Sequence, residues 1–328
     1  MMGKVYIQAA EQISIQNPLS EEWMEEPIVY HEPFVKAANP AFREYIAPNE
    51  ARRMGNIMKR ALVTSLKVLK ETGIEHPDAI ITGTSIGSLD YTERFLDDLV
   101  ANGEESLSPT YFMQTTHNTV SSTISIYTGT HSYNTTYSEG GISFELALKD
   151  AWMQFCLGQI SNALVGGYDE MLASYYELLR KTGYVGVEGM VPCSECSMSM
   201  MLNTQASLDN LCELAGVSVF RTKSNQNIRR QLEMLAEKAN VKVEAIQTVM
   251  TGLNGNPEND RLYQAVLDEF FPQAEHLQYK HLFGENYTVS ALGLYAAAHL
   301  MKKQGTPVML FVNCTMNGDC ALILLKGI

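Results

Sequence analysis

The sequence predicts an α/β fold built from two related halves. Short apolar runs with the character of buried strands alternate with helical stretches along the 328 residues, and this alternation is typical of layered α/β proteins. The strand–helix rhythm occurs twice, once in residues 1–157 and again in 158–328. No linker or low-complexity tract separates the two halves, so we expect one compact unit.

In the first half, the predicted elements follow one another in a simple order. An N-terminal strand (1–7) leads into irregular polar structure up to about Pro48, and a long helix then begins at Asn49 or Glu50. Apolar residues recur along one face of this helix, and Gly73 ends it. The later elements of this half are a strand over Ala79–Gly83, a helix behind the turn at 84–88, a helix over Asn118–Tyr127 and a strand over His131–Thr136.

The stretch Thr135–Phe155 lies at the centre of the predicted fold. A β-prone run turns abruptly here, and a helix begins behind the Gly140–Gly141 pair. Ser138 would lie at the tip of this helix, where free backbone N–H groups and the positive end of the dipole favour an anion. The segment partly matches the G-x-S-x-G nucleophile elbow, with Thr136 in place of the first glycine. Ser138 is therefore either a nucleophile or a residue that caps its helix. The buried face of the helix consists of Phe144, Leu148, Ala151 and Phe155.

The second half repeats short apolar strands and amphipathic helices. Ala163–Gly167 has the composition of a fully buried strand that ends at two glycines. Further strands are expected over Cys196–Leu202, Gly216–Phe220, Ala245–Met250, His276–Lys280, Val308–Val312 and Cys320–Leu325. Helices are expected behind Ser224, over Pro257–Phe270 and over Leu294–Lys302.

Charge and composition exclude several classes of protein. The 24 Lys and Arg residues against 37 Asp and Glu give a net charge of −13, which argues against non-specific nucleic-acid binding. No apolar run is long enough for a membrane span, and the N-terminus lacks the pattern of a signal peptide. The six cysteines lie mostly in apolar segments, as buried reduced thiols do. We expect a soluble cytoplasmic protein.

The spacing Cys193-Ser-Glu-Cys196 has the C-x-x-C form of metal and redox sites. A zinc site would need a second pair of Cys or His at similar spacing, which the sequence lacks. A redox pair would begin a helix, but the residues that follow alternate like a strand. We interpret both cysteines as structural.

Several landmarks follow one another along the chain in a fixed order. They are Ile81–Ser88, the elbow, Ala163–Gly167, Glu195, Thr251–Pro257, Lys280–Gly284, Ser290–Gly293 and Asn317–Gly318. With these landmarks the chain resembles the β-ketoacyl synthases of the thiolase fold nearly from end to end. The resemblance implies duplicated βαβαβ halves stacked as a layered α-β-α-β-α sandwich, with no cofactor and no metal.

The catalytic groups of that family are replaced in this sequence. In the family, a Cys on the elbow attacks the acyl thioester, and two His promote decarboxylation of the malonyl partner and stabilise its enolate. Ser138 falls on the Cys position, and a one-residue slip would place Tyr137 there. The first His corresponds to Thr251. The second corresponds to Glu285, or to Tyr287 when counted backward from Ser290.

Two further positions of the family site can be matched. Lys280 corresponds to the lysine that the family retains, and Asn313 to the phenylalanine that gates the pocket. A serine hydroxyl needs a base, which Thr251 cannot be. A Glu285 carboxylate would repel an enolate, so decarboxylative condensation is disfavoured. His117 and His281 are either substitute bases or structural residues.

These substitutions resemble those of chain-length factors, the ketosynthase-like subunits that pair with an active synthase. The short chain also resembles the ketosynthase-like proteins of aryl polyene and flexirubin clusters. The resemblance implies an acyl carrier protein and a synthase, or a second copy of the chain, as partners. The alternatives are a Ser138-dependent acyltransferase or thioesterase, a residual ketosynthase or decarboxylase, and an acyl-binding scaffold.

Two surfaces follow from the same resemblance. The strand His131–Thr136 would pair with its copy in a dimer, as the elbow strand of the thiolase fold does. The long helix would begin with Arg52, Arg53, Lys59 and Arg60, near the place where the family docks its acidic carrier protein. That basic group is either a docking patch or an ordinary solvated helix face.

Overall fold

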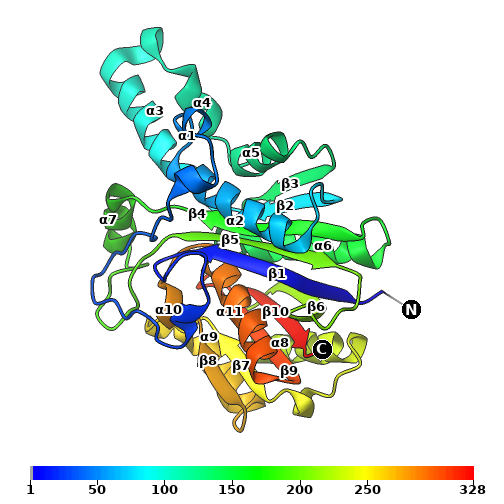
Figure 1. Cartoon of the computed structure of the whole chain (residues 1–328). Helices are drawn as coiled ribbons and strands as arrows, with labels where there is room; N and C mark the ends of the chain where they lie inside the picture. Colours follow the sequence, from blue (N-terminus) through cyan, green and yellow to red (C-terminus); the bar gives the residue numbers. More distant parts are fainter. Residues whose placement is uncertain (1–2) are drawn as a thin grey trace.

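The fold is organised around one mixed β-sheet (Figure 1). The computed structural model describes residues 3–328, and for residues 105 and 106 the backbone only. The first two residues of the strand predicted over 1–7 lie outside this range. The described strands are β1 (Val5–Ile13), β2 (Ala79–Gly83), β3 (Tyr133–Tyr137), β4 (Asn162–Asp169), β5 (Cys196–Asn203), β6 (Cys212–Arg221), β7 (Thr248–Thr251), β8 (Glu275–Gln278), β9 (Val308–Cys314) and β10 (Asp319–Lys326).

The strand order is a mirror image about the seam between β1 and β6. It reads β3-β2-β4-β5-β1 and then β6-β10-β9-β7-β8. In the first set, β2 pairs in parallel with β3 and β4, while β5 is antiparallel to β4 and β1. The second set repeats this with β7 between β8 and β9, and β10 antiparallel to β9 and β6. The predicted duplication is therefore confirmed.

The symmetry of the strand order indicates where the boundary between the two halves lies. It groups β4 and β5 with the first set, and β1 meets β6 in an antiparallel ladder from Val5–Leu214 to Ile7–Cys212. We propose that the halves comprise residues 5–203 and 212–326 rather than dividing after residue 157.

Helices form three layers around the two strand sets. The central pair is α6 (Ser143–Cys156) and α11 (Val289–Gln304). Helix α6 contacts β2, β4 and β6, and α11 contacts β1, β5 and β9, so each lies between the two sets. The outer layers are α2 (Asn56–Thr72) with α5 (Thr119–Thr128) on one side, and α8 (Asn225–Lys238) with α9 (Pro257–Phe270) on the other. This is the expected layered α-β-α-β-α sandwich.

Glycines in the strands allow the central helices to approach closely. A Cβ atom at Gly83 of β2 would lie 2.5 Å from the backbone nitrogen of Phe144 on α6. One at Gly167 of β4 would lie 2.6 Å from the Cβ of Ala291 on α11. Both distances are shorter than real Cβ contacts, so a larger residue at either position would push a central helix off the sheet.

The remaining helices lie at the edges of the sandwich. They are α1 (Pro48–Ala51), α3 (Leu89–Asn102), α4 (Pro109–Gln114), α7 (Ala173–Lys181) and α10 (Lys280–Phe283). Helices α3 and α4 project from the body of the molecule (Figure 1). Among the described residues, no helix has the length and apolar character needed to cross a bilayer.

The first long helix differs from the prediction. It is split into α1 and α2, and Arg52 and Arg53 lie in the turn between them. Gly55 has an extended backbone, and a Cβ there would lie 2.7 Å from the Tyr91 ring. The tight contact with α3 therefore ends the helical run that the periodicity predicts. Helix α7 was not predicted, because only Tyr176 of its nine residues is buried.

Candidate functional site

The predicted elbow forms where β3 leads into α6. Gly140 adopts φ +54°, which a glycine tolerates. Ser138 does not cap the helix, which was one of its two predicted roles. Within the described chain, helix α6 has no side-chain cap, and the hydroxyl of its first residue, Ser143, accepts from the Glu139 N–H at 2.8 Å and donates to the Gly140 carbonyl at 2.7 Å. Ser138 is exposed, and its Oγ donates to the Ser85 carbonyl at 3.3 Å. The cap prediction was wrong because the helix begins later than the pattern suggests.

A buried ion pair lies at the start of α10. Lys280 Nζ is 2.9 Å from Glu285 Oε2, and Asn254 Nδ2 donates to the same oxygen at 2.5 Å. Lys280 and Glu285 are only 5 % and 2 % exposed. The backbone of Glu285 is also fixed, since its N–H donates to Pro192 and its carbonyl accepts from Ser194. Each charge is therefore compensated inside the chain.

A second buried network holds Asn313 rigidly. Its amide nitrogen donates to Gly141 O at 2.9 Å and to Glu145 Oε1 at 2.6 Å. Its oxygen accepts from the Tyr279 hydroxyl at 3.0 Å. Burial raises the pKa of Glu145 to about 7, although the hydrogen bond from Asn313 opposes the shift. Asn313, which the sequence match assigned to the family's gate, thus ties β9 to the start of α6.

The two networks enclose a cavity of only 20 Å³. Such a volume holds about one water molecule. The Tyr184 and Tyr287 rings stack over it with centroids 5.5 Å apart. The lining residues are Gly141, Tyr184, Asn254, Asn259, Lys280, Glu285, Asn286, Tyr287, Val289, Ser290, Asn313, Cys314, Thr315 and Met316.

The structure brings some of the matched positions together and separates others. Lys280, Glu285 and Asn313 share the cavity wall. Thr251 is fully buried at the end of β7, where its hydroxyl donates to the Leu277 carbonyl at 3.5 Å, and it does not line the cavity. Ser138 also lies outside the lining. Asn254 and Glu145, which bond to Glu285 and Asn313, were missed because these contacts join segments far apart in the sequence.

The other candidates near the elbow are peripheral. Tyr137 is half-buried, and burial together with the neighbouring Asp150 raises its pKa to about 12. His117 is exposed beside the Gly87 turn, and His281 is exposed on α10. In the described structure, neither histidine makes a hydrogen bond with Ser138.

The predicted basic group divides into exposed and buried members. Arg52 and Arg53 are exposed, and Lys59 is half-buried with its ammonium 6.0 Å from the Phe42 ring centroid. Arg60 is 3 % exposed, lies 2.9 Å from Glu195 and donates to Asn39. Its docking assignment was wrong, because this position of α2 faces the core.

The Cys193–Cys196 pair has no metal-site geometry. Both are free, buried thiols, and burial raises the pKa of Cys193 to about 12 and that of Cys196 further. Across the described residues, no cluster of three His, Cys, Asp or Glu could hold a metal ion.

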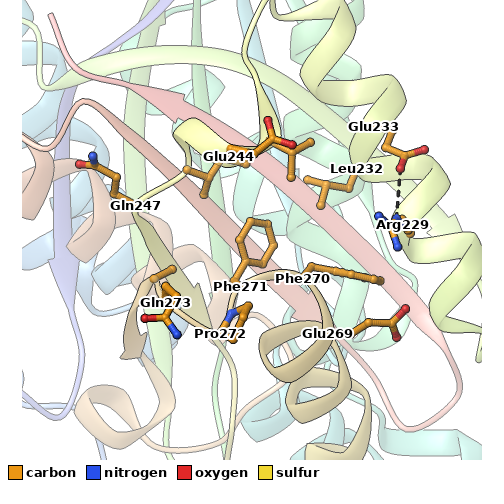
Figure 2. Close-up of a pocket in the computed structure, with 13 residues that line it drawn as sticks. Arg229, Leu232, Glu233, Glu244, Gln247, Glu269, Phe270, Phe271, Pro272 and Gln273 are labelled. Carbon is orange, nitrogen blue, oxygen red and sulfur yellow. Dashed lines mark hydrogen bonds and ion pairs between the residues drawn. The ribbon is translucent and has the colours of Figure 1, made fainter.

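A larger surface pocket lies elsewhere. It has a volume of 540 Å³ and is formed between α8, α9 and the segments beside β7 and β8 (Figure 2). Buried Leu232, Ile246 and Phe271 form its floor, and exposed carboxylates and Arg229 form its rim. None of the positions that match the family site lines it, so its size does not make it the candidate site.

Comparison with known proteins bears on the family and the fold of the chain. The sequence model described as "Beta-ketoacyl synthase, N-terminal domain" matches residues 21–255. No curated protein matches the sequence. At these low sequence identities, the solved structures below show a shared fold.

Three of these structures match the chain over essentially its whole length. One is described as a type II PKS acyl-carrier protein in complex with its ketosynthase bound to the hexaketide (13 % identity, TM-score 0.83, 100 % of both chains). Another is the ishigamide ketosynthase/chain length factor (15 %, 0.83, 100 % of both chains). The third is the ketosynthase ApeO in complex with its chain length factor ApeC from Xenorhabdus doucetiae (14 %, 0.80, 99 % of this chain and 98 % of that chain).

Proposed function

Because the chain belongs to the β-ketoacyl synthase family, we propose that it is a non-condensing subunit of the chain-length-factor type. In this role it pairs with an active ketosynthase and shapes the space in which an acyl chain grows. The proposal rests on the chemistry of the buried Lys280–Glu285 pair, since the sequence match assigns Glu285, or Tyr287, to the position of the family's second histidine.

The electrostatics of that pair oppose condensation. Decarboxylation of a malonyl group leaves an enolate, which needs hydrogen-bond donors or positive charge. Glu285 presents a carboxylate, and the positive charge of Lys280 is already directed to it at 2.9 Å. The side-chain amide of Asn254 also donates its hydrogen bond to Glu285. The groups that could stabilise an anion are thus used to stabilise Glu285.

The packing opposes substrate binding as well. A cavity of 20 Å³ has no room for an acyl chain, since ligand pockets are usually several hundred Å³. Asn313 is held by hydrogen bonds to Gly141 and Glu145, so the position of the family's gate is fixed. A subunit that only supports a partner's tunnel has no need of this space.

The alternative is a Ser138-dependent acyltransferase or thioesterase. The exposure of Ser138 favours it, because a nucleophile must be accessible. However, the Ser138 hydroxyl donates to a backbone carbonyl, which is not a base. Within the described residues, no carboxylate or imidazole forms a hydrogen bond with it. We therefore favour the non-condensing subunit.

Partner binding is part of the same proposal. Solved neighbours are described as a ketosynthase with its chain length factor and as a ketosynthase with its acyl-carrier protein. By analogy, we propose that this chain pairs with a ketosynthase, or with itself, and that the resulting assembly receives an acyl carrier protein.

A reconstitution assay tests the proposal. The purified chain is given acyl- and malonyl-loaded carrier protein, alone and with a Cys-His-His ketosynthase. We expect no 3-ketoacyl product from the chain alone. With the synthase, we expect products whose acyl chains differ in length from those that the synthase makes without this chain. A synthase whose elbow Cys is replaced by Ala shows whether the partner carries the chemistry. Product from the isolated chain that disappears in Ser138→Ala would overturn the proposal.

A further inference from the structure

A glycine-rich segment follows α7 and covers the candidate site. Gly183, Gly186 and Gly189 have φ values of +74°, +71° and +87°. This is the left-handed region, in which other L-residues are strained. Residues 186–189 are exposed. The segment 183–191 is therefore a loop with three backbone positions that only glycine adopts without strain.

The inner side of this segment lies against the Lys280–Glu285 cavity. Tyr184 lines the cavity and stacks on Tyr287. Val185 is buried in a small cluster with Met171, Tyr176 and Cys193. This cluster is separate from the main core, and small satellite clusters beneath loops open more easily than the core does.

The outer side of the same segment lines a surface hollow of 340 Å³. The opposite wall of the hollow is Tyr30–Pro33, from the long N-terminal segment that passes near α7 at the left of Figure 1. Gly186, Val187 and Glu188 belong to the lining of this hollow, whereas Tyr184 belongs to the cavity. A few residues thus separate the closed site from open solvent.

The start of the segment is bonded to α7, because the Gly183 and Tyr184 N–H groups donate to the Arg180 and Leu179 carbonyls, each at 3.1 Å. Its other bonds to the rest of the described chain go to one loop, residues 254–256. The Val191 N–H donates to the Asn254 carbonyl at 2.9 Å, and Asn256 Nδ2 donates to the Gly183 carbonyl at 3.5 Å. The segment also rests directly on Gly255, where an added Cβ would lie 2.2 Å from the Gly189 carbonyl oxygen. Asn254 donates to Glu285 as well, so the loop that anchors the segment also anchors the charged site.

We propose that residues 183–191 form a hinged lid that opens the Lys280–Glu285 cavity into the hollow beside Tyr30–Pro33. When the lid opens, Tyr184 and Val185 leave Tyr287 and Cys193, and the cavity and the hollow merge. The inference concerns access to the site, and it holds whether or not the chain condenses acyl groups.

Cys193 reports on the lid because it is 1 % exposed and packs in the cluster with Val185. The full-length protein is treated with N-ethylmaleimide under native conditions, and the labelling rate of each cysteine is followed by peptide mass spectrometry. Cys212, fully buried in β6, reports global unfolding. We expect Cys193 to react at least about tenfold faster than Cys212, since local opening requires less free energy than global unfolding.

Gly189→Ala strains the closed lid without adding a clash, because nothing lies within 4 Å of its Cβ position. We expect Cys193 to label about 5–30-fold faster, while the Cys212 rate changes far less. Gly158→Ala is the matched control, with φ +67° and equally open surroundings outside the lid. Equal rates for Cys193 and Cys212 in the wild type, or the same response of Cys193 to both substitutions, would overturn the lid.

Discussion

At the scale of single residues, two serines near the elbow differ in how firmly the fold holds them. Ser143, fully buried, makes two short hydrogen bonds with the turn before α6. We expect Ser143→Ala to lower the free energy of unfolding by about 0.5–1.5 kcal/mol, the net contribution of a typical hydrogen bond, and Ser138→Ala to change it by less than about 0.5 kcal/mol. Urea unfolding of both variants measures the difference.

The same pair of variants tests Ser138 as a nucleophile. Incubation with an acyl-carrier thioester or a fluorophosphonate, followed by intact mass, should show no adduct in the wild type. The Ser143→Ala protein should behave identically. A stoichiometric adduct that is lost only in Ser138→Ala would favour the acyltransferase alternative.

The Lys280–Glu285 pair gives a second prediction at this scale. Lys280→Met leaves a buried carboxylate with no countercharge, and we expect a loss of about 3–5 kcal/mol in the free energy of unfolding. Adding Glu285→Gln removes the charge and should restore most of the loss. Chemical denaturation of the single and double variants measures this. If the single and the double variant were equally destabilised, the charge of Lys280 would not be compensating the Glu285 carboxylate.

Glu145 gives a pH dependence whose sign follows from its burial. Its folded-state pKa, raised to about 7, exceeds the ordinary value of 4.5. Between these values the folded protein binds the proton that the unfolded chain releases, so stability falls as pH rises from about 4.5 to 7. We expect the wild type to lose about 3 kcal/mol relative to Glu145→Gln across this range. Urea midpoints at pH 5 and pH 8 test it, and parallel profiles would contradict it.

At the scale of elements, local signals decided what could be predicted from the sequence. Helix α9 has the predicted bounds, because Pro257 opens it and Asn256 accepts from Glu258 and Asn259 at its N-terminus. The break at Gly55 could not be predicted, because it depends on a ring from α3.

In the candidate site, too, only features that depend on local sequence could be predicted. Lys280, Glu285 and Asn313 could be found by position, whereas Asn254 and Glu145 could not. Their roles arise only when the segments bearing them meet Glu285 and Asn313 in the folded protein.

The turn between α1 and α2 leads to a prediction about the carrier protein. Arg52 and Arg53 remain exposed there, so an acidic carrier protein can approach them. We expect Arg52→Glu with Arg53→Glu to weaken carrier binding, with a smaller difference at high salt. Arg229→Glu with Arg230→Glu, on exposed α8, provides the matched control. Titration calorimetry measures the affinities, and an unchanged affinity would remove the docking role.

At the scale of the whole molecule, the free edge of β3 predicts dimerisation. The strand ends the sheet, and unprotected strand edges tend to pair. Tyr133 and Ile126 beside it are 45 % and 81 % exposed. We expect a dimer at micromolar concentration that dissociates in Tyr133→Lys with Ile126→Glu. The control is Leu208→Glu, at a residue that is 79 % exposed, and it should leave the dimer intact. Sedimentation velocity decides, and a monomeric wild type would contradict the prediction.

The position of β1 also has a consequence for biosynthesis. Tyr6 pairs with Asn203 and Glu213, so β1 leaves the ribosome about 200 residues before its partner strands. At 5–20 residues per second, this delay lasts about 10–40 s. During that time an apolar strand with two unsatisfied edges is exposed on the nascent chain. Translation speed and chaperone supply, rather than final stability, should therefore limit the yield of this protein in cells.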